Sequence, residues 1–124
     1  AFEEQIVAAA TRARVDPLVM LSIARRESRY DPGVRSVVGA IGLFQFMPYT
    51  AAEIAPAAGL SDVSEPALKT PRAASRLAAT YLRELLRRFD GELAPAAASY
   101  NAGEDLATIW WKAHRSAGVD MFVR

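Results

Sequence analysis

The sequence predicts a single, mainly α-helical domain with little or no β-sheet. Ala, Leu and Arg are abundant, and all three rank high in helix propensity. Apolar residues recur at the three- and four-residue spacing of a helix face, whereas no segment shows the strict alternation of a half-buried strand. The length of 124 residues fits one domain, which we expect to span residues 1–124.

The first helix is predicted over residues 2–14. Phe2, Ile6, Val7 and Ala10 are spaced so that they fall on one side of a helix. An apolar stripe of this kind normally faces the core of a globular domain. We therefore expect this segment to be an amphipathic helix that packs against the rest of the chain.

The second helix is predicted to run from Pro17 to about Tyr30. Asp16 followed by Pro17 is typical of an N-cap and the first helical residue. The apolar face of this helix leads to Glu27 near its C-terminal end, and the Asp-Pro-Gly run at 31–33 ends it. Glu27 is therefore expected at a helix end, on the apolar side.

The middle of the chain is predicted to be less regular. Three glycines indicate an irregular loop over 31–42. A short helix is expected from Pro48 to about Ala55, and residues 57–70 contain the Pro, Gly and Ser typical of a connection.

The last part of the chain contains the clearest helical pattern. A continuous apolar stripe predicts a helix from Pro71 to about Phe89, and Gly91 suits the left-handed position after its last turn. A short Ala-rich helix near 95–100 and a final helix over roughly 104–114 are expected to follow.

Charge and composition exclude several classes of function. A net charge of +1 gives no basic stripe for nucleic acid or a membrane surface, and no apolar run is long enough to span a bilayer. There is no cysteine, and His114 is the single histidine, so no Cys- or His-based metal cluster is expected. No phosphate-binding glycine loop is present, and we expect neither a metal nor a cofactor. Because the first residue is Ala rather than Met, we interpret the chain as a piece of a longer protein.

Glu27 is the strongest candidate for a catalytic residue. A glutamate on a helix is usually a solvated surface group. The helical phase of Glu27 instead places it at the end of an apolar face, beside a glycine-rich loop. A carboxyl group partly removed from water has a raised pKa, which is what a general acid needs near neutral pH.

Three motifs resemble the soluble lytic transglycosylases, which belong to the lysozyme-like superfamily and are related to the goose-type lysozymes. The motifs are Glu27-Ser28, the run Gly39-Ala40-Ile41-Gly42-Leu43-Phe44-Gln45-Phe46-Met47-Pro48 with Thr50-Ala51, and Ser99-Tyr100-Asn101-Ala102-Gly103. They occur in the order and at the spacing of the family, and the resemblance covers nearly the whole chain. It implies a lysozyme-like domain.

The resemblance implies roles for individual residues. Glu27 would be the catalytic acid and base. The residues that would bind the substrate or assist are Ser36, Gln45, Met47, Tyr100 and Asn101. The family substrate is the glycan strand of peptidoglycan, so the resemblance also implies the periplasm or cell envelope and a larger parent protein or envelope machinery.

The resemblance further implies a reaction that uses one carboxyl group. Asp31 and Glu104 lie near the motifs, but neither falls at a catalytic position of the family. The implied reaction cleaves the β-1,4 bond between N-acetylmuramic acid and N-acetylglucosamine without water and forms a 1,6-anhydromuramoyl product. Two alternatives remain open: a goose-type muramidase that hydrolyses the same bond, and an inactive peptidoglycan-binding module of a secretion, pilus or phage machine.

Overall fold

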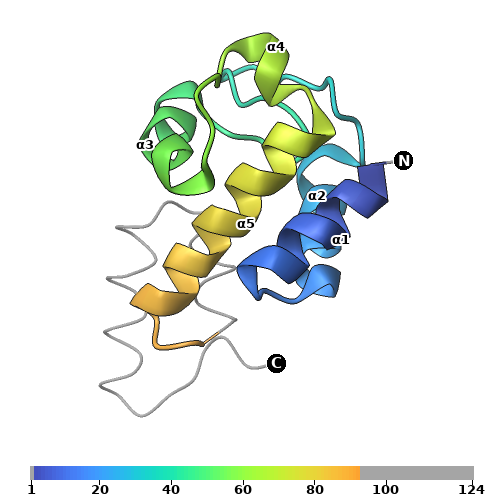
Figure 1. Ribbon diagram of the computed structural model, residues 1–124. Coiled ribbons are helices and arrows are strands. Elements are labelled where there is room, and N and C mark those ends of the chain that lie inside the picture. The colour runs from blue at the N-terminus through green and yellow to red at the C-terminus, as the bar shows by residue number, and fades with distance from the viewer. Residues whose placement is uncertain (1, 93–124) are drawn as a thin grey trace, which may run out of the picture. The chain divides into compact units, whose positions relative to one another are not determined.

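The computed structural model describes residues 2–92, and within them it is mainly helical with no β-strand (Figure 1). The five helices of this part are α1 (Phe2–Ala13), α2 (Pro17–Ser28), α3 (Pro48–Ala58), α4 (Glu65–Leu68) and α5 (Pro71–Arg88). The predicted helices near 95–100 and 104–114, and the candidate residues Tyr100 and Asn101, lie outside the described residues. The predicted fold class is confirmed.

The chain forms two compact units, Ala1–Tyr81 and Leu82–Arg124. The first unit contains α1 to α4, the beginning of α5 and four of the candidate residues, so the site can be described within it. The prediction that residues 1–124 form one domain stays a prediction.

Helices α1 and α2 pack against each other, as their apolar faces predict. Ile6 and Ala10 of α1 and Met20 of α2 are completely buried. The turn between the helices is held by the expected cap, because the Asp16 carboxylate accepts a hydrogen bond of 2.9 Å from the N–H of Leu18. The start of α2 is thus specified by its local sequence.

Helix α2 ends at Ser28, two residues earlier than predicted. Arg29 and Tyr30 have φ angles of 51° and 64°, in the left-handed region that ends a helix. The Tyr30 ring lies 5.5 Å from the ring of Phe2, and its hydroxyl donates to the carbonyl of Leu21 at 3.1 Å. These two contacts hold Tyr30 outside the helix. The local sequence does not reveal them, because they join residues far apart in the chain.

The irregular loop predicted over 31–42 is present and continues to residue 47, organised by two isolated antiparallel bridges. One bridge pairs Arg35 with Ile41, and the other pairs Ile41 with Phe46. Ile41 exchanges two backbone hydrogen bonds with Phe46, at 2.9 and 3.0 Å. The loop is therefore a short three-segment ladder, and its Leu43 and Phe44 side chains are completely buried.

Helices α3 and α4 differ from the predictions. Helix α3 continues through Pro56 to Ala58 and ends at Gly59, whose φ is 71°. Helix α4 was not predicted, because four residues are too few for a periodic pattern. Its N-cap is Ser64, whose hydroxyl accepts a hydrogen bond from Ala67 N–H at 3.4 Å.

Helix α5 confirms the predicted apolar stripe. Its buried side chains include Leu77, Leu82, Leu85 and, just after the helix, Phe89. The chain turns where glycine was expected: Gly91 has a φ of 81°, and its N–H donates to the carbonyl of Leu86 at 2.6 Å.

Candidate active site

Glu27 lies in the last turn of α2 and is half-buried. Ala24, one helical turn before it, and Ser28, directly after it, are buried, so the helix places Glu27 at the edge of the core as its phase predicts. Burial raises the pKa of the Glu27 carboxyl above its ordinary value, and the positive charge of Arg26 partly opposes this by lowering it. The carboxyl group therefore keeps its proton to a higher pH than a solvated glutamate.

Ser28 supports the helix end that carries Glu27. Its hydroxyl is buried and donates a hydrogen bond of 2.9 Å to the carbonyl of Ala24. A bond of this kind satisfies the serine hydroxyl within its own helix. Ser28 thus has a structural role beside the candidate acid.

Ser36 organises the first turn of the loop. Its N–H donates to the carbonyl of Ala40 at 2.8 Å, and its side-chain oxygen accepts from Ala40 N–H at 3.0 Å. Gly39 closes the turn with a φ of 95°. A hydroxyl that accepts one hydrogen bond can still donate its own proton. Ser36 therefore holds the turn and keeps a donor for a bound group.

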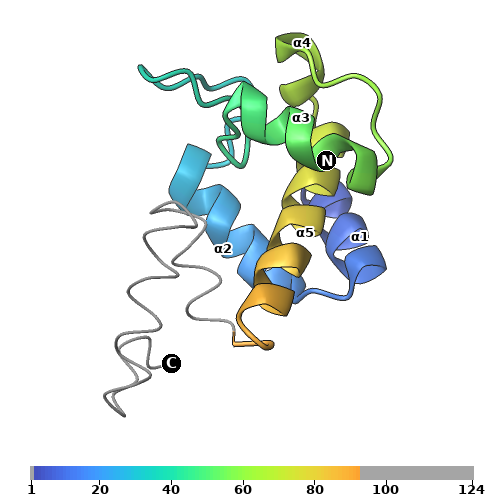
Figure 2. The same ribbon diagram turned by 90° about the vertical axis from the view of Figure 1, so that its left-hand side faces the viewer.

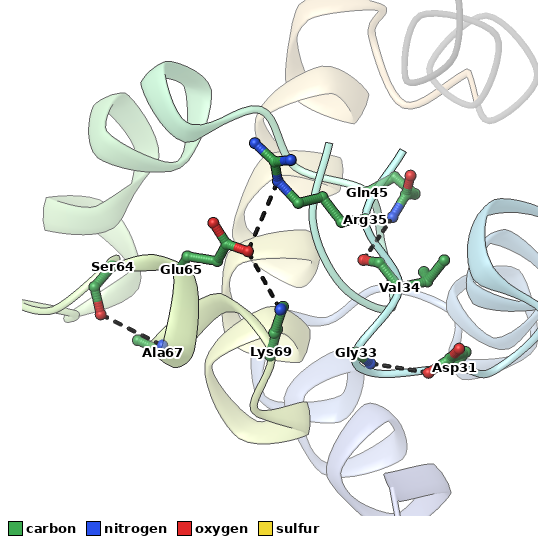
Figure 3. A network of polar contacts seen from close by, with 9 residues as sticks. All are labelled: Asp31, Gly33, Val34, Arg35, Gln45, Ser64, Glu65, Ala67 and Lys69. Atoms are coloured by element: carbon green, nitrogen blue, oxygen red, sulfur yellow. Dashed lines mark hydrogen bonds and ion pairs between the residues drawn. The ribbon is translucent and has the colours of Figure 1, made fainter. Parts of the chain in front are cut away.

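Gln45 ties together two parts of the loop (Figure 3). Its amide nitrogen donates to the carbonyl of Gly42 at 3.0 Å and to that of Val34 at 3.4 Å. Its backbone is in the left-handed region, with a φ of 53°, so the loop imposes a conformation that L-residues rarely adopt. Gln45 fixes the loop through its nitrogen, and its amide oxygen is the group that can accept from a substrate.

Met47 lies where the loop meets α3. It is half-buried and occupies the N-cap position, with extended backbone angles and no side-chain cap. The neighbouring Phe44 and Phe46 are buried, so they belong to the core. The ring of Phe46 lies 5.8 Å from that of Tyr81 on α5, a contact that anchors the end of the loop.

Sequence reasoning missed the contact between the loop and α4. Glu65 bridges two cations, with a distance of 3.7 Å to Arg35 and 3.2 Å to Lys69 (Figure 3). Gly42 approaches α4 so closely that a Cβ there would collide with the carbonyl oxygen of Leu68. The Ser64-Glu65 start of α4 is the one local signal that could have indicated this helix.

A second catalytic carboxylate is not apparent among the described residues. Asp31 is exposed, and its carboxylate accepts a hydrogen bond of 3.0 Å from Gly33 N–H, as in an ordinary turn. Within residues 2–92, no cluster of three or more His, Asp or Glu side chains could hold a metal ion. The same part of the chain contains no helix that is both long and apolar enough to cross a membrane. Glu104 lies outside the described residues.

Comparison with known proteins shows consistent similarity to one group of bacterial enzymes. A soluble lytic murein transglycosylase of Salmonella typhimurium is 35% identical over 91 residues, which cover 73% of this chain and 14% of that protein. Lytic transglycosylase Slt of Pseudomonas aeruginosa, solved as an inactive Glu-to-Gln variant, superposes with a TM-score of 0.82 at 34% identity, over 88% of this chain and 18% of that one.

The 70 kDa soluble lytic transglycosylase of Escherichia coli also has a TM-score of 0.82, at 28% identity over 90% of this chain and 18% of that protein. The chain therefore spans less than a fifth of the length of these three relatives. The model of the transglycosylase SLT domain matches residues 4–121, nearly the whole sequence. The chain belongs to the transglycosylase SLT domain family.

Proposed function

We propose that this chain is a catalytic domain that cleaves peptidoglycan glycan strands as a lytic transglycosylase, with Glu27 as its single acid and base. The observation that carries the proposal is the half-buried Glu27, whose pKa is raised by burial at the end of α2. Membership of the family supplies the reaction type. The inactivity of a Glu-to-Gln variant of the Pseudomonas aeruginosa enzyme supports an essential glutamate.

The proposed reaction uses one carboxyl group twice, first as an acid and then as a base. Protonated Glu27 donates its proton to the glycosidic oxygen as the bond from C1 of N-acetylmuramic acid breaks, and the N-acetylglucosamine end leaves as an alcohol. The acetamido group of the muramic acid stabilises the positive charge at C1, as in substrate-assisted glycosidases. The Glu27 carboxylate then takes the proton of the C6 hydroxyl, whose oxygen bonds to C1 and closes the 1,6-anhydro ring.

The loop residues supply the substrate contacts in this proposal. Ser36 offers its hydroxyl proton, Gln45 its amide oxygen, and Met47 an apolar surface at the start of α3. Tyr100 and Asn101 keep the roles that the family implies for them. We place the reaction in the periplasm or cell envelope, where the substrate lies, and within a longer parent protein.

The proposal predicts that Glu27→Gln abolishes wall lysis while binding persists. The amide keeps the shape of the side chain but cannot donate an acidic proton, so turnover falls by about 100-fold or more. Release of soluble fragments from purified cell walls measures lysis, and co-sedimentation with the walls measures binding. Asp31→Asn is the matched control, because Asp31 is an exposed turn residue whose bond to Gly33 an amide oxygen can also accept. Undiminished lysis by Glu27→Gln would contradict the assignment.

Mass spectrometry of the released fragments tests the reaction type. An anhydro product is lighter by one water than the product of hydrolysis. Products with the mass of a free reducing end would identify a goose-type muramidase instead. Binding to walls without release of any fragment would identify a binding module.

A further inference from the structure

The backbone changes its conformation soon after Glu27. Arg29 and Tyr30 have φ angles of 51° and 64°, so two consecutive residues other than glycine occupy the left-handed region. Such a conformation costs about 1–2 kcal/mol per residue, and residues other than glycine usually adopt it singly. Strain of this kind persists only where the surrounding structure holds it, and it is concentrated at functional sites. The helix end that carries Glu27 is therefore held by more than its own backbone.

The side chain of Tyr30 holds this helix end through two contacts. Its hydroxyl donates a hydrogen bond of 3.1 Å to the carbonyl of Leu21, so the side chain extends back along the last turns of α2. Its ring lies 5.5 Å from the ring of Phe2, the first residue of α1. Each of these contacts contributes about 1 kcal/mol, so together they are comparable to the backbone strain at Tyr30.

Glu27 lies between the two residues that the hydroxyl of Tyr30 joins. Leu21 comes before it on α2, and Tyr30 follows the helix end. Figure 2 shows α2 ending where the chain begins the loop toward α3. The last turn of a helix frays readily, because its carbonyl groups lack partners within the helix. A side chain that spans this turn and also contacts α1 therefore restricts the movement of Glu27.

We propose that Tyr30 is a positioning residue, which fixes the end of α2 against α1 so that the Glu27 carboxyl meets the glycosidic oxygen. This inference rests on the proposed function and adds the means by which its acid is oriented. A general acid must lie within about 3 Å of the atom that it protonates. A displacement of about 1 Å can lower the rate by about 100-fold. Tyr30 acts through the backbone and does not touch the reacting atoms.

Two substitutions of Tyr30 remove its contacts in steps. Tyr30→Phe keeps the ring beside Phe2 and loses the hydrogen bond to Leu21, whereas Tyr30→Ala loses both. The substrate is soluble, uncrosslinked peptidoglycan strands, and the temperature is one at which circular dichroism shows each variant folded. We expect kcat to fall about two- to fivefold in Tyr30→Phe and about ten- to 100-fold in Tyr30→Ala. KM should stay unchanged, because the residues proposed to bind the substrate are intact.

Val15→Ala is the control for a general loss of stability. Val15 is buried in the turn between α1 and α2, at the opposite end of α2 from Tyr30. Its replacement removes buried methyl groups and so lowers the free energy of unfolding. Because it leaves both contacts of Tyr30 in place, its kcat should equal that of the unaltered chain.

Tyr30→Gly tests whether the side chain acts through the backbone. Glycine loses both contacts, as alanine does, but it adopts a φ of 64° without strain. The helix end should therefore keep its conformation better, and kcat should exceed that of Tyr30→Ala by about threefold or more. A tyrosine that acted directly on the substrate would give equal losses in the two variants, which would overturn the inference.

The remaining outcomes separate this inference from the proposed function. An unchanged kcat in Tyr30→Ala, or a change confined to KM, would overturn the positioning role. If Tyr30→Ala does not fold, Tyr30→Phe decides, and an unchanged kcat there would overturn it as well. Loss of lysis in Glu27→Gln would uphold the proposed reaction in each of these cases, whereas retained lysis in Glu27→Gln would contradict the reaction itself.

Discussion

At the scale of single residues, burial and one neighbouring charge shift the pKa of Glu27 in opposite directions. Burial at the end of α2 raises the pKa of the carboxyl, and the guanidinium of Arg26 lowers it. A general acid must be protonated in the free enzyme, so kcat/KM should fall as the pH rises through the pKa of Glu27. In the proposed mechanism, Arg26 therefore limits how far into the alkaline range wall lysis continues.

Replacement of this arginine should move the pH profile. In Arg26→Gln the positive charge is lost, the pKa of Glu27 rises further, and the alkaline limb of kcat/KM shifts to higher pH. The shift should shrink at high salt, because Arg26 is exposed and its charge is screened. Arg29→Gln is the control, since Arg26 and not Arg29 is the positive charge that lowers the pKa of Glu27. A profile unchanged in Arg26→Gln would show that another group controls the limb.

The residue scale is also where sequence reasoning was most informative about the site. The phase of α2 predicted that Glu27 lies at the edge of the apolar face, and its half-buried state confirms that placement. The local cap at Asp16 was also predictable, because it needs only a neighbour two residues away. The hydrogen bond that the Gln45 side-chain amide donates to the carbonyl of Val34, eleven residues earlier, was not predictable, because it depends on how the loop closes.

At the scale of elements, the loop and α4 depend on each other. Gly42 lies against the backbone of Leu68, and the ion pairs of Glu65 join Arg35 of the loop to α4. Exposed ion pairs contribute only about 0–1 kcal/mol. The close packing at Gly42 is therefore the stronger constraint on the position of the loop. Sequence reasoning missed α4 because four residues show no helical periodicity, and the contact of α4 with the loop cannot be seen in the local sequence.

A matched pair of glycine substitutions tests this coupling. Gly42 and Gly91 have nearly the same φ, 83° and 81°, but only Gly42 has a neighbour that a methyl group would strike. An alanine at either position is strained by the left-handed backbone, whereas only the alanine at Gly42 also collides with a neighbour. Gly42→Ala should lower the free energy of unfolding by about 2 kcal/mol or more beyond the loss in Gly91→Ala, as measured by urea denaturation. It should also reduce wall lysis. Equal losses in the two variants would show that the contact with α4 does not constrain the loop.

At the scale of the whole molecule, the helical class followed from periodicity, whereas the ends of helices did not. The stripe of α5 was long enough to identify by itself, and its buried Leu77 and Leu85 confirm it. Helix α2 ended early and α3 ended late, because the ends depend on left-handed residues such as Arg29 and Gly59 and on contacts elsewhere. Long-range packing is the part of the fold that local sequence reasoning cannot supply.

Ser75 of α5 shows how one polar atom in the core affects the stability of the whole chain. The residue is completely buried, and its hydroxyl has no hydrogen-bond partner among residues 2–92. A buried hydroxyl without a partner carries its desolvation cost uncompensated, about 1–3 kcal/mol. Ser75→Ala removes that cost and leaves only a small void, so the free energy of unfolding should rise by about 1 kcal/mol. Ser28→Ala is the opposite case, because the buried Ser28 hydroxyl donates to Ala24. Urea denaturation should therefore show a gain for Ser75→Ala and no gain for Ser28→Ala; a loss in Ser75→Ala would mean that its hydroxyl is satisfied in solution.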